Sequence, residues 1–323
     1  NEESHIEACL RSLFDGDEAM QNAQVVVADG GSTDRTREIV AILHAEFSNI
    51  TLIDNPERLQ SAAMNCIVES YARFGHTVLV RCDAHTIYPK RYVLRVARSL
   101  LDHKADALAV PMDSQGIGHM QKAIAWVSDS RIGSGGSAHR GGRSSGYVDH
   151  GHHAGFLIAS FLAIGGYDAS FSHNEDAEFD YRLRMAGGQI WLDADIRIKY
   201  RPRASLFLLA QQYWYYGRGR ARTVFKHRLR PRIRQILPVI NVIMNIFSFI
   251  AAAISSPIFL VWPGIYLALL LGTGATMALQ ERSFRGFYAG PALGTMHLAW
   301  GLGFIWQSAT WRAKTWRRSP ARP

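Results

Sequence analysis

The apolar and polar positions divide the chain into a part with short alternating elements and a part with long apolar runs. Four short apolar runs predict strands: 24–28, 50–53, 77–80 and 107–110. Between them, segments whose apolar residues recur at helical spacing predict helices: 36–47, 61–71 and 91–102. Repeated strand–helix–strand units predict an α/β fold with helices covering a parallel sheet. Ligands bind such folds beyond the carboxyl ends of the strands.

The long apolar runs lie in the last third of the chain. Residues 236–280 include no charged side chain, and 286–311 form a second uncharged run that contains only His297 as a titratable group. A membrane crossing needs about 20 apolar residues. We therefore expect about three transmembrane segments, 236–254, 257–279 and 287–311, with a tight break at 255–257. A buried core helix is the alternative, but a soluble domain rarely excludes charge over so long a stretch.

The charge balance differs between the two parts. Residues 1–195 carry 17 Lys and Arg against 26 Asp and Glu, whereas residues 196–323 carry 19 Lys and Arg against the single acid Glu281. Basic clusters at 218–234 and 312–322 flank the apolar runs, and such flanks bind acidic lipid headgroups. Membrane lipids are therefore the expected anionic partner. Nucleic acid is not expected, because the basic run lacks interleaved stacking residues.

Cysteine usage bears on the compartment. Cys9, Cys66 and Cys82 are few, odd in number and without disulfide-framework spacing, and no secretory signal opens the chain. We expect a reducing cytosol around the soluble part. Two basic flanks on the cytoplasmic side would require an even number of crossings, whereas the apolar lengths favour three, so the count stays open.

Candidate chemistry lies at the ends of the predicted strands. Asp29 ends one strand and Asp83 follows another, with His85 two positions later. A divalent cation that neutralises a departing diphosphate needs only a few protein carboxylates besides the phosphates, and an imidazole also suits Mn²⁺. Asp83 and His85 are thus expected to hold Mg²⁺ or Mn²⁺. Asp and His are also common in solvated turns, which is the alternative.

Several sequence blocks resemble one family. They read VVVADGGSTD at 25–34, RCDAH at 81–85, GGYD at 165–168, NEDAEF at 174–179 and RLRMAG at 182–187. In this order they resemble the inverting family-2 glycosyltransferases, which have the GT-A fold, a nucleotide-diphospho-sugar transferase domain with a Rossmann-like parallel or mixed sheet. The resemblance extends to YGRGR at 216–220 and to the apolar tail. Within the family, the chain is most similar to the glucosyltransferases of bacterial succinoglycan synthesis.

The resemblance implies roles for particular residues. Glu2 and Asp29 would contact the nucleotide sugar, and Asp83 would hold the metal ion. Asp176 would be the general base that deprotonates the acceptor hydroxyl, and Glu175 would help position the acceptor. Independently of the family, acids at 175–178 are also typical of a helix N-terminus.

Two arginines and a loop have competing interpretations. Arg218 and Arg220 could clamp the diphosphate, contact lipid headgroups or form a solvated face. The family's Gln-x-x-Arg-Trp motif is absent from 211–220, which favours transfer of a single sugar. The Gly-, Ser- and His-rich segment 133–155 is expected to be a mobile loop over the site. Its three histidines at 150, 152 and 153 are expected to contact the acceptor or lie in a plain loop, because their spacing disfavours zinc.

The resemblance also implies an organisation and an activity. The expected parts are a catalytic domain at 1–205, a basic interfacial helical segment at 206–235, transmembrane helices at 236–311 and a basic tail at 312–323. The family's first strand, which helps bind the nucleotide base, would precede position 1, so the chain as printed is expected to lack it, and whether the chain is active without it stays open.

The expected activity is transfer of a hexose, expected to be β-1,3-linked glucose, from a UDP-sugar to a polyprenyl-diphosphate-linked saccharide. The expected place is the bacterial inner membrane, with several crossings and the catalytic domain facing the cytoplasm. A polyprenyl-phosphate glycosyltransferase, another polysaccharide synthase and a non-catalytic membrane-tethered nucleotide-binding module are the alternatives. A dinucleotide oxidoreductase is disfavoured, because no Gly-x-Gly-x-x-Gly follows a predicted strand.

Overall fold

The chain forms two compact units in the computed structural model, which describes residues 1–16, 18–137 and 140–318, with side chains described as far as 311. The first unit comprises Asn1–Asp113 and Ser137–Tyr200. The second comprises Ser114–Gly136 and Arg201–Pro323. The acidic part of the sequence thus corresponds to the first unit, and the apolar runs lie in the second.

The first unit contains three small sheets. One is a parallel pair, β1 (Val25–Asp29) and β2 (Ile50–Asp54). The main sheet is mixed, and its strands in spatial order are β3 (Val78–Val80), β7 (His153–Leu157), β4 (Ala107–Ala109), β8 (Ile190–Leu192) and β6 (Gly146–Tyr147). The third sheet pairs β5 (Met112–Ser114) with β9 (Ile198–Tyr200).

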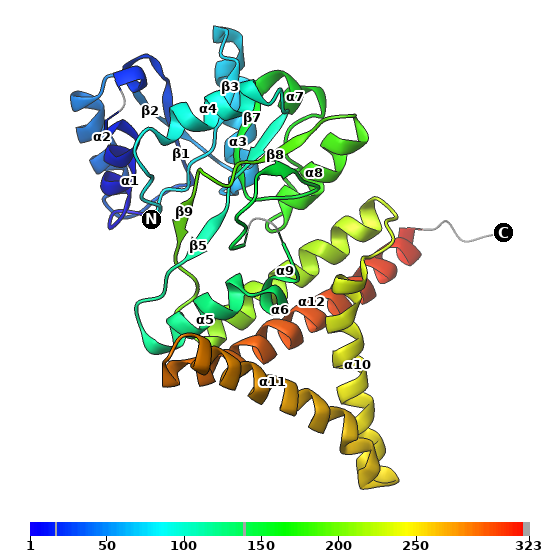
Figure 1. Ribbon diagram of the computed structural model, residues 1–323. Coiled ribbons are helices and arrows are strands. Elements are labelled where there is room, and N and C mark those ends of the chain that lie inside the picture. The colour runs from blue at the N-terminus through cyan, green and yellow to red at the C-terminus, as the bar shows by residue number, and fades with distance from the viewer. Residues whose placement is uncertain (17, 138–139, 319–323) are drawn as a thin grey trace, which may run out of the picture. The chain divides into compact units, whose positions relative to one another are not determined.

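Helices cover these strands and enclose two apolar cores (Figure 1). The helices of this unit are α1 (Ile6–Phe14), η1 (Glu18–Asn22), α2 (Thr36–Glu46), α3 (Gln60–Tyr71), η2 (Ala72–Phe74), α4 (Tyr92–Asp102), α7 (Ile158–Ala163) and α8 (Glu175–Met185). One core gathers around Ile50 and Tyr92, and the other around Phe156 and Phe179. The second core lies directly behind the polar residues of the candidate site.

The seven elements predicted from apolar periodicity are confirmed, with ends that differ by at most one residue. The main sheet is mixed, as the resemblance allowed, rather than parallel throughout as the repeated strand–helix units alone indicated. Strand β7 lies between β3 and β4 and is antiparallel to both. This strand begins inside the segment 133–155, which was expected to be a loop because of its Gly and His content. Burial of its side chains on both faces, not alternation of polar and apolar residues, makes it a central strand.

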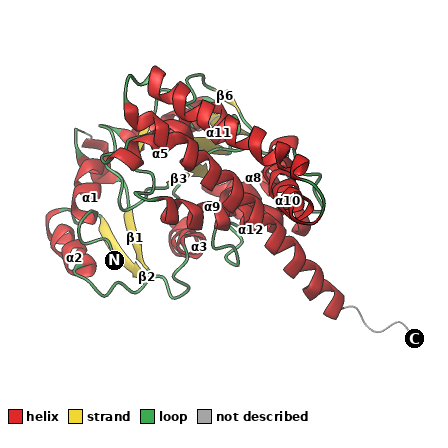
Figure 2. Cartoon of the chain, turned by 90° about the horizontal axis from the view of Figure 1, so that it is seen from below, coloured by secondary structure: helices red, strands yellow, loops and turns green. Residues whose placement is uncertain are grey.

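The second unit is helical. Its elements are α5 (His119–Asp129), α6 (Arg131–Ser134), α9 (Leu206–Lys226), α10 (Ile233–Ile254), η3 (Pro257–Leu260), α11 (Val261–Gln280), η4 (Phe284–Tyr288) and α12 (Ala289–Arg318). Helices α9 and α12 run side by side, as Figure 2 shows. A Cβ atom on Gly217 would lie 2.0 Å from the Trp300 carbonyl oxygen, and one on Gly303 would lie 2.2 Å from that of Trp214. These glycines permit the close approach of the two helices.

Two helices of the second unit are long and apolar enough to cross a membrane, Ile233–Ile254 and Pro257–Gln280. In the most apolar 18-residue stretch of each helix, only 22% and 11% of the stretch is buried. Most of their apolar surface therefore faces outward, unlike that of a core helix in a soluble protein. Figure 1 shows them as the two legs of a hairpin, and the predicted break at 255–257 is confirmed. The third expected segment, 287–311, covers the last two residues of η4 and most of α12, and α12 is not among the helices that meet these criteria in the described residues. Three crossings therefore stay a prediction.

Candidate active site

Asp83 and Asp176 contact the same arginine of the first unit. Arg81 follows β3, and its side chain is 6% exposed. Its Nη1 lies 2.8 Å from Asp176 Oδ1, and its Nε lies 3.5 Å from Asp83 Oδ1. The two carboxylates that the sequence predicted for opposite sides of the reaction are thus separated by one guanidinium group.

The start of α8 presents Asp176. Asn174 adopts a left-handed conformation with φ of 64°, which asparagine tolerates better than most residues. Helix α8 then begins at Glu175, so that Asp176 lies in its first turn, where unpaired backbone N–H groups favour negative charge. The helix-terminus interpretation is therefore correct, and it is compatible with a catalytic role.

The GGYD block supplies Tyr167. Its hydroxyl lies 3.3 Å from Asp176 Oδ1, and Arg81 Nη1 lies 3.3 Å from the same hydroxyl. Asn65 holds the Tyr167 backbone through two hydrogen bonds, of 2.8 and 2.9 Å. Gly166 has φ of 65°, and a Cβ there would lie 2.4 Å from Asn65 Oδ1. A side chain at this position would therefore displace the tyrosine from the site.

The two neighbouring acids at the start of α8 have opposite pKa shifts. Burial alone would raise the pKa of Asp176, but the charges of Arg81 and His153 outweigh it and hold that pKa well below its usual range. Burial and the adjacent Asp176 charge raise the pKa of Glu175 to about 7. At neutral pH, Asp176 is thus an ionised proton acceptor, whereas Glu175 is partly protonated and can donate a hydrogen bond.

Asp83 and His85, the two predicted metal ligands, lie in the loop that follows β3. Gln60 Nε2 donates to Asp83 Oδ1 at 2.7 Å, whereas none of the described residues donates a hydrogen bond to Oδ2. Burial opposes ionisation of Asp83, but Arg81, His152 and His85 outweigh it and lower its pKa. The His85 side chain is 61% exposed and lies 3.5 Å from Glu2 Oε1.

This donor set fits one kind of cation site. Over the described ranges, no group of three or more His, Cys, Asp and Glu side chains could enclose a metal ion. A carboxylate oxygen and an imidazole do fit a divalent ion that takes its other ligands from a diphosphate and water. The metal roles of Asp83 and His85 stay predictions.

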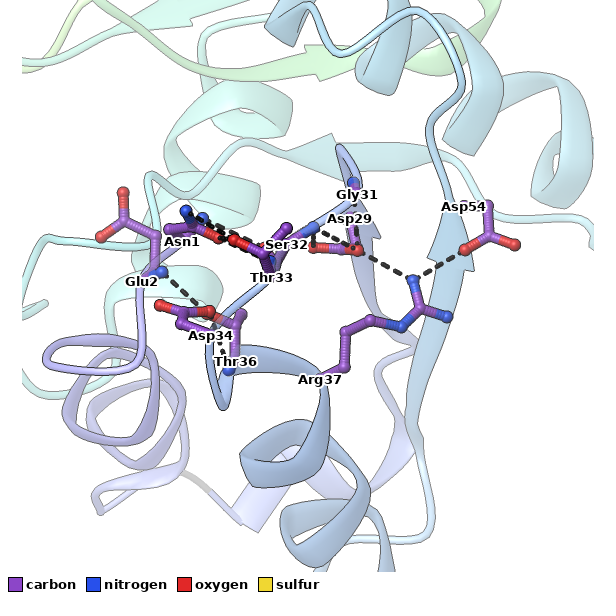
Figure 3. A network of polar contacts seen from close by, with 10 residues as sticks. All are labelled: Asn1, Glu2, Asp29, Gly31, Ser32, Thr33, Asp34, Thr36, Arg37 and Asp54. Atoms are coloured by element: carbon purple, nitrogen blue, oxygen red, sulfur yellow. Dashed lines mark hydrogen bonds and ion pairs between the residues drawn. The ribbon is translucent and has the colours of Figure 1, made fainter.

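Asp29 folds the loop that follows β1 (Figure 3). Its carboxylate accepts hydrogen bonds from the backbone N–H groups of Gly31 and Ser32 and from Arg37 Nη1, the last at 2.8 Å. Burial alone would raise the pKa of Asp29, but the hydrogen bonds from Ser32 and Arg37 lower it to about 2. These three bonds reach Oδ2, and the Ser32 N–H also donates to Oδ1 at 3.3 Å, so both carboxylate oxygens are engaged within the protein. Direct contact of Asp29 with the nucleotide stays a prediction.

The first two residues lie against the same loop (Figure 3). The Asn1 side chain accepts a 2.7 Å hydrogen bond from the backbone of Thr33, and the Glu2 backbone N–H donates to Thr36 Oγ1 at 2.7 Å. The Glu2 carboxylate, by contrast, lies toward His85. Glu2 is thus near the predicted metal ligand, and its contact with the nucleotide sugar stays a prediction.

The histidines at 150, 152 and 153 differ in their surroundings. His153 belongs to β7 and is 1% exposed, so the expectation of a loop residue is wrong for it. Burial lowers the pKa of His152 to about 4, although Asp83 opposes this. His150 Nδ1 lies 2.6 Å from Asp180 Oδ2. Acceptor contact stays a prediction for His150 and His152.

Sequence reasoning missed several residues of this site. Arg81 is the first residue of the RCDAH block, but only Asp83 and His85 of that block were predicted to belong to the site. Tyr167 belongs to the GGYD block, and Asp180 follows Asp176 at a spacing of one helical turn. That spacing was the one available signal that Asp180 faces the same side of α8.

Arg218 and Arg220 belong to α9 in the second unit. Both are half-buried, and the Arg218 guanidinium lies 5.7 Å from the centre of the Tyr215 ring. Their role toward a diphosphate or toward lipid stays a prediction. Residues 319–323 of the expected basic tail lie outside the described residues.

Comparison with known proteins identifies the family. Residues 1–162 match the model of glycosyl transferase family 2. The succinoglycan biosynthesis protein ExoA of Rhizobium meliloti (strain 1021) is 45% identical over 304 residues, which cover 94% of this chain and 91% of that protein. A Methanococcus voltae dolichyl N-acetyl-alpha-D-glucosaminyl phosphate 3-beta-D-2,3-diacetamido-2,3-dideoxy-beta-D-glucuronosyltransferase is 26% identical over 239 residues, covering 70% of this chain and 72% of that protein.

A solved structure agrees in fold. The mannosyltransferase PcManGT from Pyrobaculum calidifontis, in complex with GDP-Man and Mn²⁺, superposes with a TM-score of 0.56 and 18% identity, over 93% of this chain and 83% of its own. The predicted GT-A fold is thereby confirmed, as is the resemblance stated from the sequence blocks. The chain is a glycosyltransferase and belongs to glycosyltransferase family 2.

Proposed function

We propose that this chain is a membrane-bound inverting glycosyltransferase that transfers glucose from UDP-glucose to a polyprenyl-diphosphate-linked saccharide during bacterial exopolysaccharide synthesis. The proposed linkage is β-1,3. The observation that carries the chemistry is the common contact of Asp83 and Asp176 with Arg81. Because of it, both carboxylates are near enough to act on a single sugar ring.

In the proposed reaction, the acceptor hydroxyl oxygen attacks the anomeric carbon from the side opposite the diphosphate. The bond from that carbon to the diphosphate oxygen breaks, and its electron pair leaves with UDP. The hydroxyl proton passes to Asp176, which the neighbouring cations hold ionised. Attack opposite the leaving group inverts the anomeric configuration, through an oxocarbenium-like transition state.

Arg81 and Glu175 would support this step from either side of Asp176. The buried Arg81 charge favours the ionised form of both carboxylates. Glu175, whose pKa is raised to about 7, can donate a hydrogen bond to the acceptor sugar. A divalent cation held by Asp83 and His85 would neutralise the negative charge that develops on the departing diphosphate. The Mn²⁺ ion in the complex of the Pyrobaculum mannosyltransferase supports cation use.

Donor, acceptor and location rest on relatives and on the second unit. The name of the Rhizobium relative supports a role in succinoglycan synthesis. The outward-facing apolar helices Ile233–Ile254 and Pro257–Gln280 support an integral protein of the bacterial inner membrane. We propose that the first unit faces the cytoplasm and that Arg218 and Arg220 contact phosphate groups.

The test is release of UDP by the full chain in lipid nanodiscs, supplied with Mg²⁺ or Mn²⁺. UDP-glucose, UDP-galactose and UDP-N-acetylglucosamine would each be offered, with either a polyprenyl-diphosphate disaccharide or a polyprenyl phosphate as acceptor. UDP-glucose with the disaccharide should give the fastest turnover. Turnover only with polyprenyl phosphate, or with none of the donors, would refute the proposed function.

Asp176→Asn checks the assigned base. Loss of a general base typically lowers kcat by about 10²- to 10⁴-fold, and we expect such a loss with little change in KM for UDP-glucose. Asp102→Asn, an exposed acid at the end of α4, is the matched control and should keep wild-type kcat. Wild-type kcat in Asp176→Asn would remove this residue from the mechanism.

A further inference from the structure

A chain of polar side chains leads from Asp176 into the interior of the first unit. The Tyr167 hydroxyl lies 3.3 Å from Asp176 Oδ1 and 2.7 Å from His153 Nδ1. His153 Nε2 lies 2.5 Å from Asp180 Oδ1, and Asp180 Oδ2 lies 2.6 Å from His150 Nδ1. His153 Nδ1 is also 3.4 Å from Asp176 Oδ1.

The chain is buried and comes from different parts of the first unit. His153, on β7, and Asp180, on α8, are each 1% exposed. Phe156 and Phe179 lie with their rings edge-on to the imidazole, so that little solvent screens it. Asp176 and Asp180 are four residues apart on α8 and therefore lie on the same face of the helix. His153 lies between their two carboxylates.

The charges around His153 imply a direction for the hydrogen bonds at His153 and Tyr167. With two carboxylates beside it, the imidazole is protonated and donates from both nitrogens. Burial alone would lower the pKa of His153, but Asp180 and Asp176 raise it to about 10. The Tyr167 hydroxyl then accepts from His153 and from Arg81, which leaves its single hydrogen for Asp176 Oδ1.

Other charged groups also face Asp176. Arg81 contacts it from the end of β3, and Glu175 precedes it on α8. His152 lies close enough to interact electrostatically with both Asp176 and Asp83, but burial keeps it neutral. Arg81 and His153 are therefore the two positive groups at Asp176, and Asp180 is the counter-charge of His153.

We propose that His153, held by Asp180, is a positioning residue for the catalytic base. It orients the Tyr167 hydroxyl toward Asp176 and, with Arg81, keeps that carboxylate ionised and in one orientation. Asp180 makes this possible, because a buried imidazolium without a counter-charge would lose its proton. This inference rests on the assignment of Asp176 as the base in the proposed function.

The decisive test is the pH dependence of kcat/KM in His153→Gln, measured on the full chain in nanodiscs. Removal of a positive charge within about 4–6 Å of a carboxylate raises its pKa by about 1–3 units. Asp176 must be ionised to act, so activity is lost at low pH, on the acid limb of the profile. In the variant this acid limb should lie at a higher pH than in the wild type. KM for UDP-glucose should not change, because His153 makes no contact with Asp83 among the described residues.

A second variant keeps the shape of the site. Tyr167→Phe removes only the hydroxyl and leaves the His153 charge in place. We expect kcat to fall about tenfold, the effect of losing one hydrogen bond to a charged group, and the acid limb of the pH profile to shift less than in His153→Gln, because the His153 charge remains. An unchanged kcat would overturn the proposal, even if His153→Gln failed to fold.

The control is the other buried ion pair on α8. Glu178 is fully buried and pairs with Arg182 at 2.8 Å, and no contact printed for the described residues joins either side chain directly to Asp176. Glu178→Gln should lower the melting temperature, but kcat/KM should fall at the same low pH as in the wild type. If His153→Gln folds and its kcat/KM falls at the same low pH as that of the wild type, His153 has only a structural role. Absence of wild-type turnover with every donor would instead refute the proposed function.

Discussion

At the scale of single residues, the site depends on how buried charges are balanced. Arg81 and His153 are the positive groups, and they lie among the carboxylates of Asp83, Asp176 and Asp180. Charges removed from water are costly unless they are paired and hydrogen-bonded. This arrangement leaves Asp176 ionised, whereas the adjacent Glu175 has no cation within hydrogen-bond distance in the described part of the chain.

Glu175 gives the folded protein a characteristic pH dependence. Its pKa rises from 4.5 to about 7 on folding, so the folded state binds its proton more tightly than the unfolded state does. The contribution of Glu175 to stability therefore falls as the pH rises from about 4.5 to 7 and stays low above that range.

Glu175→Gln should remove this loss. The melting temperature of the variant should match that of the wild type near pH 4.5 and exceed it by a few degrees at pH 7.5, at about 2–4 °C per kcal/mol. The measurement is thermal unfolding from pH 4.5 to 7.5, with the exposed Glu69→Gln on α3 as the control. A constant difference across this range would contradict the raised pKa.

At the scale of elements, β7 is the strand on which the site is built. It carries His153 and lies between β3, which leads to Arg81, and β4. Helix α4 packs closely over it at Gly155, where a Cβ atom would lie 2.8 Å from Val96 Cγ1 and 3.2 Å from the Leu79 carbonyl oxygen. The absence of a side chain here allows α4 to lie directly on the sheet.

Gly155→Val should therefore separate α4 from β7. Overpacking of this kind typically costs about 1–3 kcal/mol, and we expect a fall in the free energy of unfolding together with a lower kcat. Chemical denaturation followed by circular dichroism measures the first effect. Gly146→Ala on β6 of the same sheet is the control, since no atom lies within 4 Å of its added Cβ. Equal stabilities of the two variants would contradict this packing argument.

At the scale of the whole molecule, the chain consists of two units of opposite net charge and different content. The acidic first unit contains Asp83 and Asp176, and the second contains the basic and apolar segments. The first unit is built like other GT-A domains, as the superposition with PcManGT indicates. The second unit provides the two apolar helices by which we propose that the enzyme is held in the membrane.

Insertion of these helices can be tested by adding charge. Leu267, near the middle of α11, is 56% exposed, and an arginine at the centre of a span costs about 2.5–3.5 kcal/mol on insertion. Leu267→Arg should reduce the share of protein that stays in membranes after alkaline carbonate extraction. Ile42→Arg on α2, where the side chain is 58% exposed, should not. Extraction of the wild type itself by carbonate would contradict the membrane assignment.

The sequence by itself determined the features that depend on local pattern. Periodicity identified β1 to β4 with the helices between them, and the uncharged run identified the α10–α11 hairpin. Both can be predicted because the order of apolar residues along the chain shows which side chains must avoid water. The short blocks also identified Asp83 and Asp176, since a strand end and a helix start are local positions.

Only the tertiary structure decided what depends on contacts between distant segments. It inserted β7 between β3 and β4, because strands pair through backbone hydrogen bonds that leave little trace in side-chain order. It brought Asp83 and Asp176 to one guanidinium group and placed His153 between Asp176 and Asp180. The charge on each of these groups is set by the others through space, and for that reason no local pattern in the chain could predict it.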